Sequence, residues 1–200
     1  MNKQPKSDNI KNINALLYGN LYRNNCDVPP EIDNGYQPAA VMILLTQYKG
    51  EWHILFTQRT DTVSDHKGQV AFPGGAWETS DSCLRETALR ETYEEIGVRR
   101  EDINIFGSMP PVQTVTGYYI VPYVGIISWP YEVIIQEREV ESIFLIPFNW
   151  LINEENRSEK EYMDIKHNIR RDVLFYQEYD GHVLWGITAM LTVSLLELLK

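Results

Sequence analysis

The sequence predicts a fold of the α/β or α+β class, because segments patterned as strands and as helices interleave along the chain. The apolar run at residues 37–47 is typical of a buried strand. Lys49 and Gly50 turn it into a second segment, residues 52–59, in which apolar and polar residues alternate. A strongly apolar segment from Gly186 onward has the pattern of a helix. Elements of both kinds in one chain indicate a sandwich in which helices cover a sheet.

A short amphipathic helix is expected near the N-terminus, where apolar residues recur at helical spacing between Ile10 and Leu17. Pro29 and Pro30 follow and break it. We interpret residues 1–35 as a helical extension of one domain that spans residues 1–200, since 200 residues suffice for a single domain with a sizeable core.

The middle of the chain carries the signals for a helix and several short strands. A helix is expected over residues 84–97, with Asp81 or Ser82 as its N-cap and Gly97 as its C-terminal cap. The segments expected to be strands or short apolar segments are residues 70–72, 103–109, 119–128 and 142–146.

The last quarter of the chain is less regular. A helical turn is expected at residues 149–153, and the charged stretch 153–171 is interpreted as a surface excursion within the domain. Residues 173–179 and 183–185 flank Asp180 and Gly181, which is a hairpin signal.

Charge and composition exclude several classes of protein. The formal net charge of −10, with no long run of lysine or arginine, argues against a nucleic-acid partner. The apolar stretch at residues 185–199 is too short to span a bilayer and carries Glu197, so no membrane partner is expected. Cys26 and Cys83 are too few for a disulfide framework and are expected to be reduced thiols. We therefore expect a soluble, cytoplasmic protein.

The clearest chemical signal is the acidic segment that contains Arg90, Glu91, Glu94 and Glu95. At about 100° per residue of an α-helix, the carboxylates of residues 91, 94 and 95 fall within an arc of roughly 100°. Carboxylates that converge repel one another, and a hard cation such as Mg²⁺ among them removes that repulsion. The alternative is a solvated helix face.

Two further features favour a metal and diphosphate site over a solvated face. Gly74 and Gly75 precede the helix and lack side chains, so their backbone can approach a metal ion or a phosphate closely. Arg90 stands four residues before Glu94, where an ion pair can fix a ligand carboxylate. Glu86 is expected to support Arg90 from one turn away.

Residues 68–98 resemble the Nudix box, whose second half is arginine, glutamate, a small or apolar residue, any residue, two glutamates, any residue, glycine and an apolar residue. The run from Arg90 to Val98, RETYEEIGV, matches it with Thr92 as the one softer position. The first half departs, because fourteen residues separate Gly75 from Arg90 where the general pattern has thirteen. Asp81 or Ser82 occupies the early acidic position, depending on the direction of counting.

The longer spacer resembles that of coenzyme A diphosphatases, a subfamily with an additional upstream signature. The residues that match this signature are Phe56, Thr57, Arg59, His66, Gly68, Val70, Ala71, Phe72, Pro73, Gly74 and Gly75. Together the two motifs cover residues 56–98 without a gap.

The resemblance implies a Nudix-type α/β/α sandwich with a mixed β-sheet and a metal-dependent hydrolase. It implies that coenzyme A or its derivatives are cut at the diphosphate into 3′,5′-ADP and 4′-phosphopantetheine. Metal ligands would be Glu91, Glu94, Glu95 and the backbone carbonyl of Gly75, holding Mg²⁺ or Mn²⁺, with Arg90 to orient them.

Further roles implied by the resemblance concern the substrate. Arg59, His66 and Lys67 could meet its phosphates beside Gly74 and Gly75, and His66 could instead serve only to hold its loop. Glu139 is a candidate general base or additional ligand, against a surface salt bridge. A second copy of the chain, as a homodimer, is one further candidate partner.

Two other functions remain open from the sequence. One is a Nudix diphosphatase for ADP-ribose, a dinucleotide or a nucleoside triphosphate, because one fold hosts many substrates. The other is a nucleotide-binding module that does not cut its ligand. Such modules typically lose the metal glutamates, whereas this chain retains Glu91, Glu94 and Glu95.

Overall fold

The computed structural model describes residues 13–23, 35–60, 68–164 and 169–200. Its strands and helices, with their bounds, are β1 (Gln37–Tyr48), β2 (Glu51–Arg59), β3 (Val70–Ala71), β4 (Gly74–Ala76), β5 (Asn104–Ser108), β6 (Val112–Gln113), β7 (Tyr118–Ile126), β8 (Val140–Pro147), β9 (Arg157–Asp164), β10 (Ile169–Tyr176), α1 (Ile13–Asn20), α2 (Leu84–Ile96), α3 (Phe148–Ile152) and α4 (Gly186–Leu198). Short 3₁₀ turns lie at Arg100–Asp102 and Glu154–Asn156.

The central sheet is mixed, as expected. Its strands run in the order β3-β2-β1-β7-β5, with β8 also paired to β2, β4 to β1 and β6 to β7. The long β1 and β7 lie parallel, whereas the β1–β2, β2–β8 and β5–β7 pairs are antiparallel. The predicted β1–β2 hairpin is confirmed: Lys49 and Gly50 both have positive φ, at 51° and 79°, which suits a tight two-residue turn.

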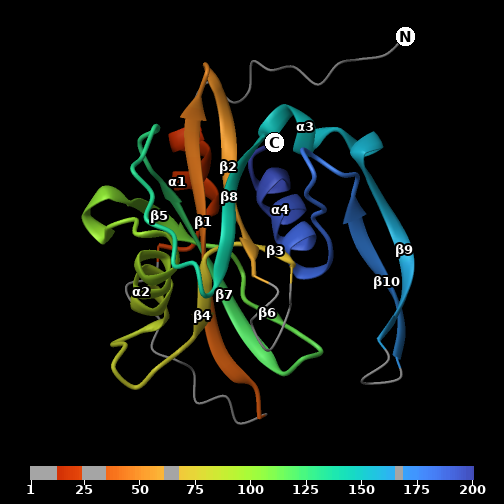
Figure 1. The fold of residues 1–200 in the computed structure, drawn as a ribbon, viewed down its shortest axis with the longest axis horizontal. Helices are drawn as coiled ribbons and strands as arrows, with labels where there is room; N and C mark the ends of the chain where they lie inside the picture. Colours follow the sequence, from red (N-terminus) through yellow and green to blue (C-terminus); the bar gives the residue numbers. More distant parts are fainter. Residues whose placement is uncertain (1–12, 24–34, 61–67, 165–168) are drawn as a thin grey trace.

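Helices cover both faces of this sheet (Figure 1). Side chains alternate along β1, so that Ile43 and Leu45 pack in one core with α1, α3 and α4, while Met42 and Leu44 pack in a second core with α2. The same alternation holds on β2, where Phe56 faces the first core and Leu55 the second. The predicted α/β/α sandwich is therefore confirmed.

The β4 strand was not expected from the sequence. Residues 74–76 carry no apolar pattern, yet they pair antiparallel with Ala39, Ala40 and Val41 at the start of β1. The small residues of both segments allow this close approach. The pairing fixes the glycine loop against the middle of the sheet, directly before α2.

The charged stretch 153–171 was interpreted as a surface excursion, and its described part is largely strand. It contains most of an antiparallel hairpin of β9 and β10, which forms a separate two-stranded sheet at one side of the molecule (Figure 1). Trp185 packs against this sheet, stacked on Phe175 at 5.5 Å between ring centroids and tilted against Tyr162 at 5.4 Å. These aromatic contacts come from the segment before α4, so local charge patterning could not show them.

The start of α2 differs from the prediction, whereas its end agrees. The N-cap is Cys83, without a side-chain cap, and neither Asp81 nor Ser82 fills that position. The buried Cys83 is disulfide-bonded, so the expectation of reduced thiols is wrong; Cys26 lies outside the described residues. Sequence separation does not limit a disulfide, because only the distance in space does. Gly97 caps the other end with φ 70°, donating its N–H to the carbonyl of Tyr93.

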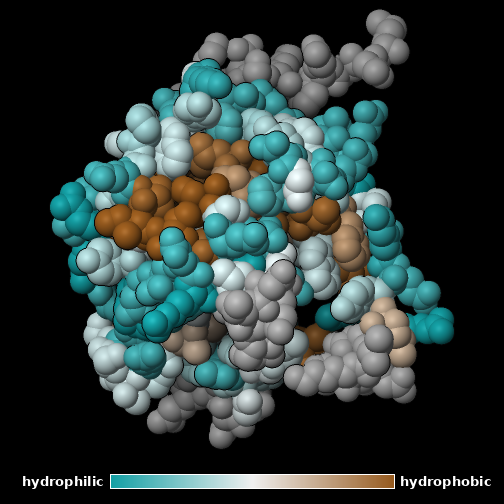
Figure 2. Space-filling view, viewed as in Figure 1, coloured by the Kyte–Doolittle hydropathy of each residue, from teal (hydrophilic) through white to brown (hydrophobic). Residues whose placement is uncertain are grey.

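The surface of the described residues carries several large apolar side chains. Ile134 is 70% exposed. Figure 2 shows that, on the face that Figure 1 presents, other apolar residues lie next to one another. None of the helices in the described ranges is long and apolar enough to cross a membrane.

Candidate functional site

Arg90 organises the site from the middle of α2. Its Nε and Nη2 donate to the two carboxylate oxygens of Asp81, at 2.9 and 3.0 Å, and Nη2 also donates to the carbonyl of Ala76 at 3.2 Å. Its Nη1 donates to both Glu91 and Glu94 at 2.9 Å. The guanidinium thus ties the loop before the helix to two of the predicted metal ligands.

The sequence left open whether Asp81 or Ser82 takes the early acidic position of the motif. Its side chain is 5% exposed and accepts further hydrogen bonds from the backbone N–H of Glu78 and the hydroxyl of Thr87, at 3.1 and 2.9 Å. Burial by itself raises the pKa of Asp81, but the hydrogen bonds from Arg90, Glu78 and Thr87 outweigh it, and the pKa lies below its ordinary value. Asp81 is therefore an ionised anchor for Arg90.

Glu86 does not have the predicted supporting role. Its carboxylate pairs with Arg100 at 3.0 Å and lies 3.9 Å from Arg85. The helical spacing of Glu86 and Arg90 permitted contact, but Asp81 fills the guanidinium edge that Glu86 would have needed.

Glu95 is the deepest carboxylate of the site, with a side chain 3% exposed. One oxygen accepts the backbone N–H of Gly74 at 3.3 Å, and the other lies 3.6 Å from Nη1 of Arg59. Burial raises the pKa of Glu95 to about 8, although Arg59 opposes the shift; the negative charges of Glu91 and Glu139 add to it. Among the described residues, Arg59 at 3.6 Å is the one cation paired with this buried carboxylate, which leaves its charge only partly compensated.

Glu91 lies directly beside Gly75. A Cβ atom on Gly75 would overlap the Glu91 carboxylate, approaching Cδ to 2.6 Å and Oε2 to 2.9 Å. Burial raises the pKa of Glu91, Arg90 opposes this, and the charges of Glu94 and Glu139 reinforce it. The absence of a side chain at Gly75 therefore makes room for a second carboxylate.

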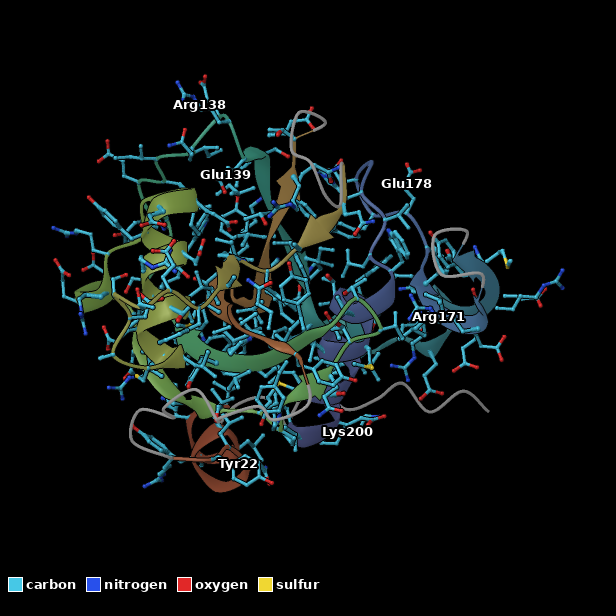
Figure 3. All side chains as sticks on the ribbon, turned by 90° about the horizontal axis from the view of Figure 1, so that it is seen from below. Tyr22, Arg138, Glu139, Arg171, Glu178 and Lys200 are labelled. Atoms are coloured by element: carbon cyan, nitrogen blue, oxygen red, sulfur yellow. The ribbon has the colours of Figure 1, made fainter. Side chains whose placement is uncertain are left out.

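Glu94 and Glu139 complete the acidic group from its exposed side. The Glu94 side chain is 54% exposed. The exposed Glu139 precedes β8 on a loop that is fastened to the end of α2, because the N–H groups of Ile134 and Gln136 donate to the carbonyls of Ile96 and Glu95, at 3.1 and 2.9 Å. Figure 3 shows Glu139 against the body of the molecule, with Arg138 pointing outward.

The side chains of this site suit a metal ion by the chemistry of their donor atoms, although they do not yet surround a common point. Within the described part of the chain, no three Asp, Glu, His or Cys side chains gather closely enough to hold a metal ion as they stand. Arg90 instead holds Glu91 and Glu94 on its own Nη1. The donors are nevertheless the oxygens that hard divalent cations prefer, and the raised pKa values of Glu91 and Glu95 mark negative charge that a cation would relieve.

Of the predicted phosphate contacts, Arg59 reaches the site. Its side chain is 25% exposed and points to Glu95, and its Nε is buried without a hydrogen-bond partner among the described residues. His66 and Lys67 lie outside the described residues. Arg59 and Gly74 thus meet at Glu95, and Gly75 lies against Glu91, although the sequence places these residues up to 36 positions apart (59 to 95).

A cavity of about 510 Å³ lies along another flank of α2. It is lined by Arg90 and Asp81 but by none of Glu91, Glu94 and Glu95, and Tyr93, Arg99 and Arg100 form much of its wall. Residues 86, 89, 90 and 93 share that flank at helical spacing, so the cavity adjoins the acidic site without containing it.

The sequence comparison decides the family. The family model described as NUDIX domain matches residues 35–167. The chain belongs to the Nudix family. A relative named uncharacterized Nudix hydrolase NudL, from Enterobacter sp. (strain 638), is 36% identical over 151 residues, covering 76% of this chain and 77% of the relative. The protein of that name from Photorhabdus laumondii is 28% identical over 179 residues, covering 88% and 93%.

Solved structures of Nudix proteins also match. An Ap4A hydrolase from C. elegans, in a binary complex, has a TM-score of 0.47 at 18% identity, covering 54% of this chain and 77% of that one. The NUDIX domain of NrtR from Shewanella oneidensis, complexed with ADP ribose, has a TM-score of 0.45 at 21% identity, covering 59% and 77%. The family assignment rests on the sequence matches. The chain is a Nudix hydrolase that acts on a nucleoside diphosphate derivative, and Nudix hydrolases generally use divalent metal ions.

Proposed function

We propose that this Nudix hydrolase cleaves the diphosphate of coenzyme A or its derivatives, giving 3′,5′-ADP and 4′-phosphopantetheine or its acylated form. The observation that carries the proposal is the approach of Arg59 to Glu95, at 3.6 Å. Arg59 belongs to the upstream signature that resembles coenzyme A diphosphatases, and Glu95 belongs to the Nudix box. Both motifs therefore contribute to one site, as a substrate-specific signature should.

The reaction adds one water molecule across the P–O–P bridge. The water oxygen forms a bond to one phosphorus, the bond from that phosphorus to the bridging oxygen breaks, and the bridging oxygen leaves with the electron pair on the other phosphate. We propose that Glu91, Glu94, Glu95 and the carbonyl of Gly75 hold Mg²⁺ or Mn²⁺. When bound, the cation neutralises charge on the phosphoryl oxygens and orients the scissile bond.

The protein's own groups position this chemistry. Arg90, held by Asp81, fixes the orientation of Glu91 and Glu94. Glu139 is the proposed general base, because it is exposed to solvent and its charge acts on Glu91 and Glu95 across the site. It would take the proton that the attacking water loses.

The substrate phosphates would meet Arg59, His66 and Lys67 on one side and the backbone at Gly74 and Gly75 on the other. The guanidinium of Arg59 suits a phosphate because it offers several donors in one plane, and its Nε has no partner among the described residues. These contacts would select a diphosphate with a further phosphate nearby. We also propose that the whole chain, residues 1–200, works as one Nudix domain with its box at residues 68–98.

A panel of four substrates tests the assignment. Coenzyme A, acetyl-coenzyme A, ADP-ribose and a dinucleotide are incubated with the protein and either Mg²⁺ or Mn²⁺, and the products are separated by chromatography. Metal-dependent release of 3′,5′-ADP from the first two substrates is expected. Intact coenzyme A beside cleaved ADP-ribose or dinucleotide would overturn the substrate class while leaving the family unchanged.

A further inference from the structure

His182 lies far from α2 in sequence, yet it is fastened to the strand that carries Arg59. A tight turn presents it: Asp180 and Gly181 have φ of 50° and 84°, and Tyr179 and His182 exchange both backbone hydrogen bonds, at 2.8 and 3.0 Å. The turn packs on the side of the sheet that α4 covers. The turn therefore fixes the position of His182 over β8 and β2.

The ring of His182 begins a row of stacked rings that leads to the glycine loop. It lies flat on Phe144 of β8, with centroids 3.7 Å apart and planes at 3°. Phe144 stacks on Phe56 of β2 at 5.8 Å, and Phe56 on Phe72 at 5.1 Å. Phe72 directly precedes Pro73 and Gly74. The row thus connects the C-terminal turn with the loop that contacts Glu95.

Gln58 adds a hydrogen-bonded link parallel to this row. Its Nε2 donates to the carbonyl of Gly68, and its Oε1 lies 3.1 Å from Nδ1 of His182. Because Nε2 is committed to Gly68, Oε1 must accept, and Nδ1 of His182 must carry the hydrogen. His182 and Gly68 together fix both ends of the Gln58 amide.

This fixed amide stands where the β2–β8 ladder is irregular. The register shifts between Gln58 and Arg59, and such irregularities in a strand redirect the side chains beside them. Successive residues of a strand face opposite sides, so Gln58 faces the α4 core while Arg59 faces α2 and Glu95. Whatever fixes Gln58 therefore also fixes the backbone from which Arg59 extends.

We propose that His182 is a positioning residue for the Nudix site: through Gln58 it holds the irregularity in β2 that directs Arg59 to Glu95 and to the substrate phosphates. The inference rests on the proposed roles of Arg59 and Glu95. It assigns a function to a histidine on the opposite face of the sheet from the glutamates. Its effect is on substrate binding, because Arg59 contacts substrate and His182 does not.

Two variants separate the contacts of His182. His182→Phe retains an aromatic ring on Phe144 but removes the donor to Gln58, whereas His182→Asn retains a donor and removes the ring. His53→Asn is the matched control, because His53 also lies on β2, but its ring contacts the carbonyl of Glu51 at 3.0 Å and the ring of Tyr48, near the opposite end of the strand. Each variant is assayed with whichever substrate the four-compound panel shows to be cleaved.

His182→Phe is expected to raise KM about tenfold with kcat within about twofold, as losses of groups that orient a binding side chain typically do. His182→Asn should recover most of that loss, and His53→Asn should match the unchanged protein. In an Arg59→Ala background, His182→Phe should have no further effect on KM, because its action passes through Arg59. Equal effects of His182→Phe with and without Arg59 would overturn the proposal.

A spectroscopic measurement provides a readout independent of turnover. The buried Nε–H of Arg59 should give a slowly exchanging signal in a ¹⁵N NMR spectrum, identified by its absence in Arg59→Ala. This signal should shift in His182→Phe and stay in place in His53→Asn. An unshifted Arg59 signal together with a normal KM in His182→Phe would refute the positioning role of His182. Activity in Glu95→Gln would instead refute the assignment of the Nudix site itself.

Discussion

Asp81, in the loop before α2, and Arg90, in the middle of that helix, form a two-point ion pair, with Oδ1 accepting from Nε at 2.9 Å and Oδ2 from Nη2 at 3.0 Å. Asp81→Asn keeps the shape of the side chain but removes its charge and one acceptor. We expect kcat/KM to fall about 10- to 100-fold, because Arg90 would no longer fix Glu91 and Glu94. The free energy of unfolding should fall by about 1–3 kcal/mol, since buried donors lose their partner. Steady-state kinetics and urea unfolding measure the two effects.

Glu101→Gln is the control for this variant. Glu101 also pairs with an arginine, Arg99 at 3.8 Å, but both side chains are more than half exposed. Exposed pairs contribute little, so kinetics should be unchanged. Normal activity in Asp81→Asn would show that the departure from the Nudix spacing left the early acidic position without a role.

The pKa of Asp81 predicts a specific acid sensitivity. Burial raises the pKa, the hydrogen bonds from Arg90, Glu78 and Thr87 lower it further than burial raises it, and the folded value lies below the ordinary 3.8. The ionised group therefore stabilises the fold above pH 3.8, and this stabilisation is lost as the pH falls from there through the folded pKa. Between pH 5 and pH 2, the melting temperature should fall more steeply for the unchanged protein than for Asp81→Asn. Parallel curves would contradict this role.

Adjacent glycines are expected to fail differently when substituted. Gly75→Ala places its Cβ on the carboxylate of Glu91, which can swing away, so activity should fall about tenfold or more while stability changes little. In Gly74→Ala the new Cβ would overlap the backbone carbonyl of Ala40, which cannot move aside as a side chain can. Gly74 also has a φ of 156°, which residues other than glycine rarely adopt, so the fold itself should be destabilised. Thermal unfolding and kinetics distinguish the two outcomes.

Gly19→Ala is the matched control for these glycines, because Gly19 lies in α1 and, apart from its chain neighbours and the helix's own backbone, no described heavy atom lies within 4 Å of its Cβ position. It should retain activity and gain up to about 1 kcal/mol in stability. If Gly75→Ala were as active as Gly19→Ala, close packing of Glu91 on Gly75 would have no catalytic importance.

Local signals in the sequence were sufficient for the elements whose causes are local. Gly50, Gly97 and Gly181 adopt the positive φ angles that glycine favours, and Lys49 and Asp180 directly precede a glycine in the two tight turns. The helix that carries Glu91, Glu94 and Glu95 was also predicted, whereas their joint binding of a metal ion stays a prediction. The hairpin turn at Asp180 was predicted, but not that it delivers His182 to Gln58.

Features set by long-range contact could not be predicted. Nothing in residues 74–76 indicates a strand until β1 is beside them, and nothing in the spacing decides between Asp81 and Ser82 until the backbone of the loop is known. The β9–β10 hairpin has charged, weakly alternating residues, and its order depends on pairing and on Trp185. In each case the structure is decided by a residue elsewhere in the chain or by the path of a loop, and neither can be inferred from local sequence.

Glu139→Gln tests the proposed general base. The amide keeps the size of the side chain but cannot take a proton from water, so kcat should fall about 10²- to 10⁴-fold with little change in KM. Glu137→Gln, at an exposed position in the same loop, is the control and should remain fully active. A Glu139→Gln protein with normal kcat over the whole accessible pH range would exclude Glu139 as the base.

Glu95→Gln tests the metal assignment by two independent measurements. The substitution removes a charge from a side chain that is 3% exposed, so the metal-free variant should be at least as stable as the unchanged protein. Turnover should be abolished.

Mn²⁺ should raise the melting temperature of the unchanged protein, since a ligand at about 100 times its Kd adds roughly 2.7 kcal/mol of stability, and this gain should largely disappear in Glu95→Gln. Glu86→Gln, whose carboxylate pairs with Arg100 outside the acidic group, should keep both the activity and the Mn²⁺ effect. Surviving activity in Glu95→Gln, or an equal Mn²⁺ effect in both proteins, would contradict metal binding by Glu95.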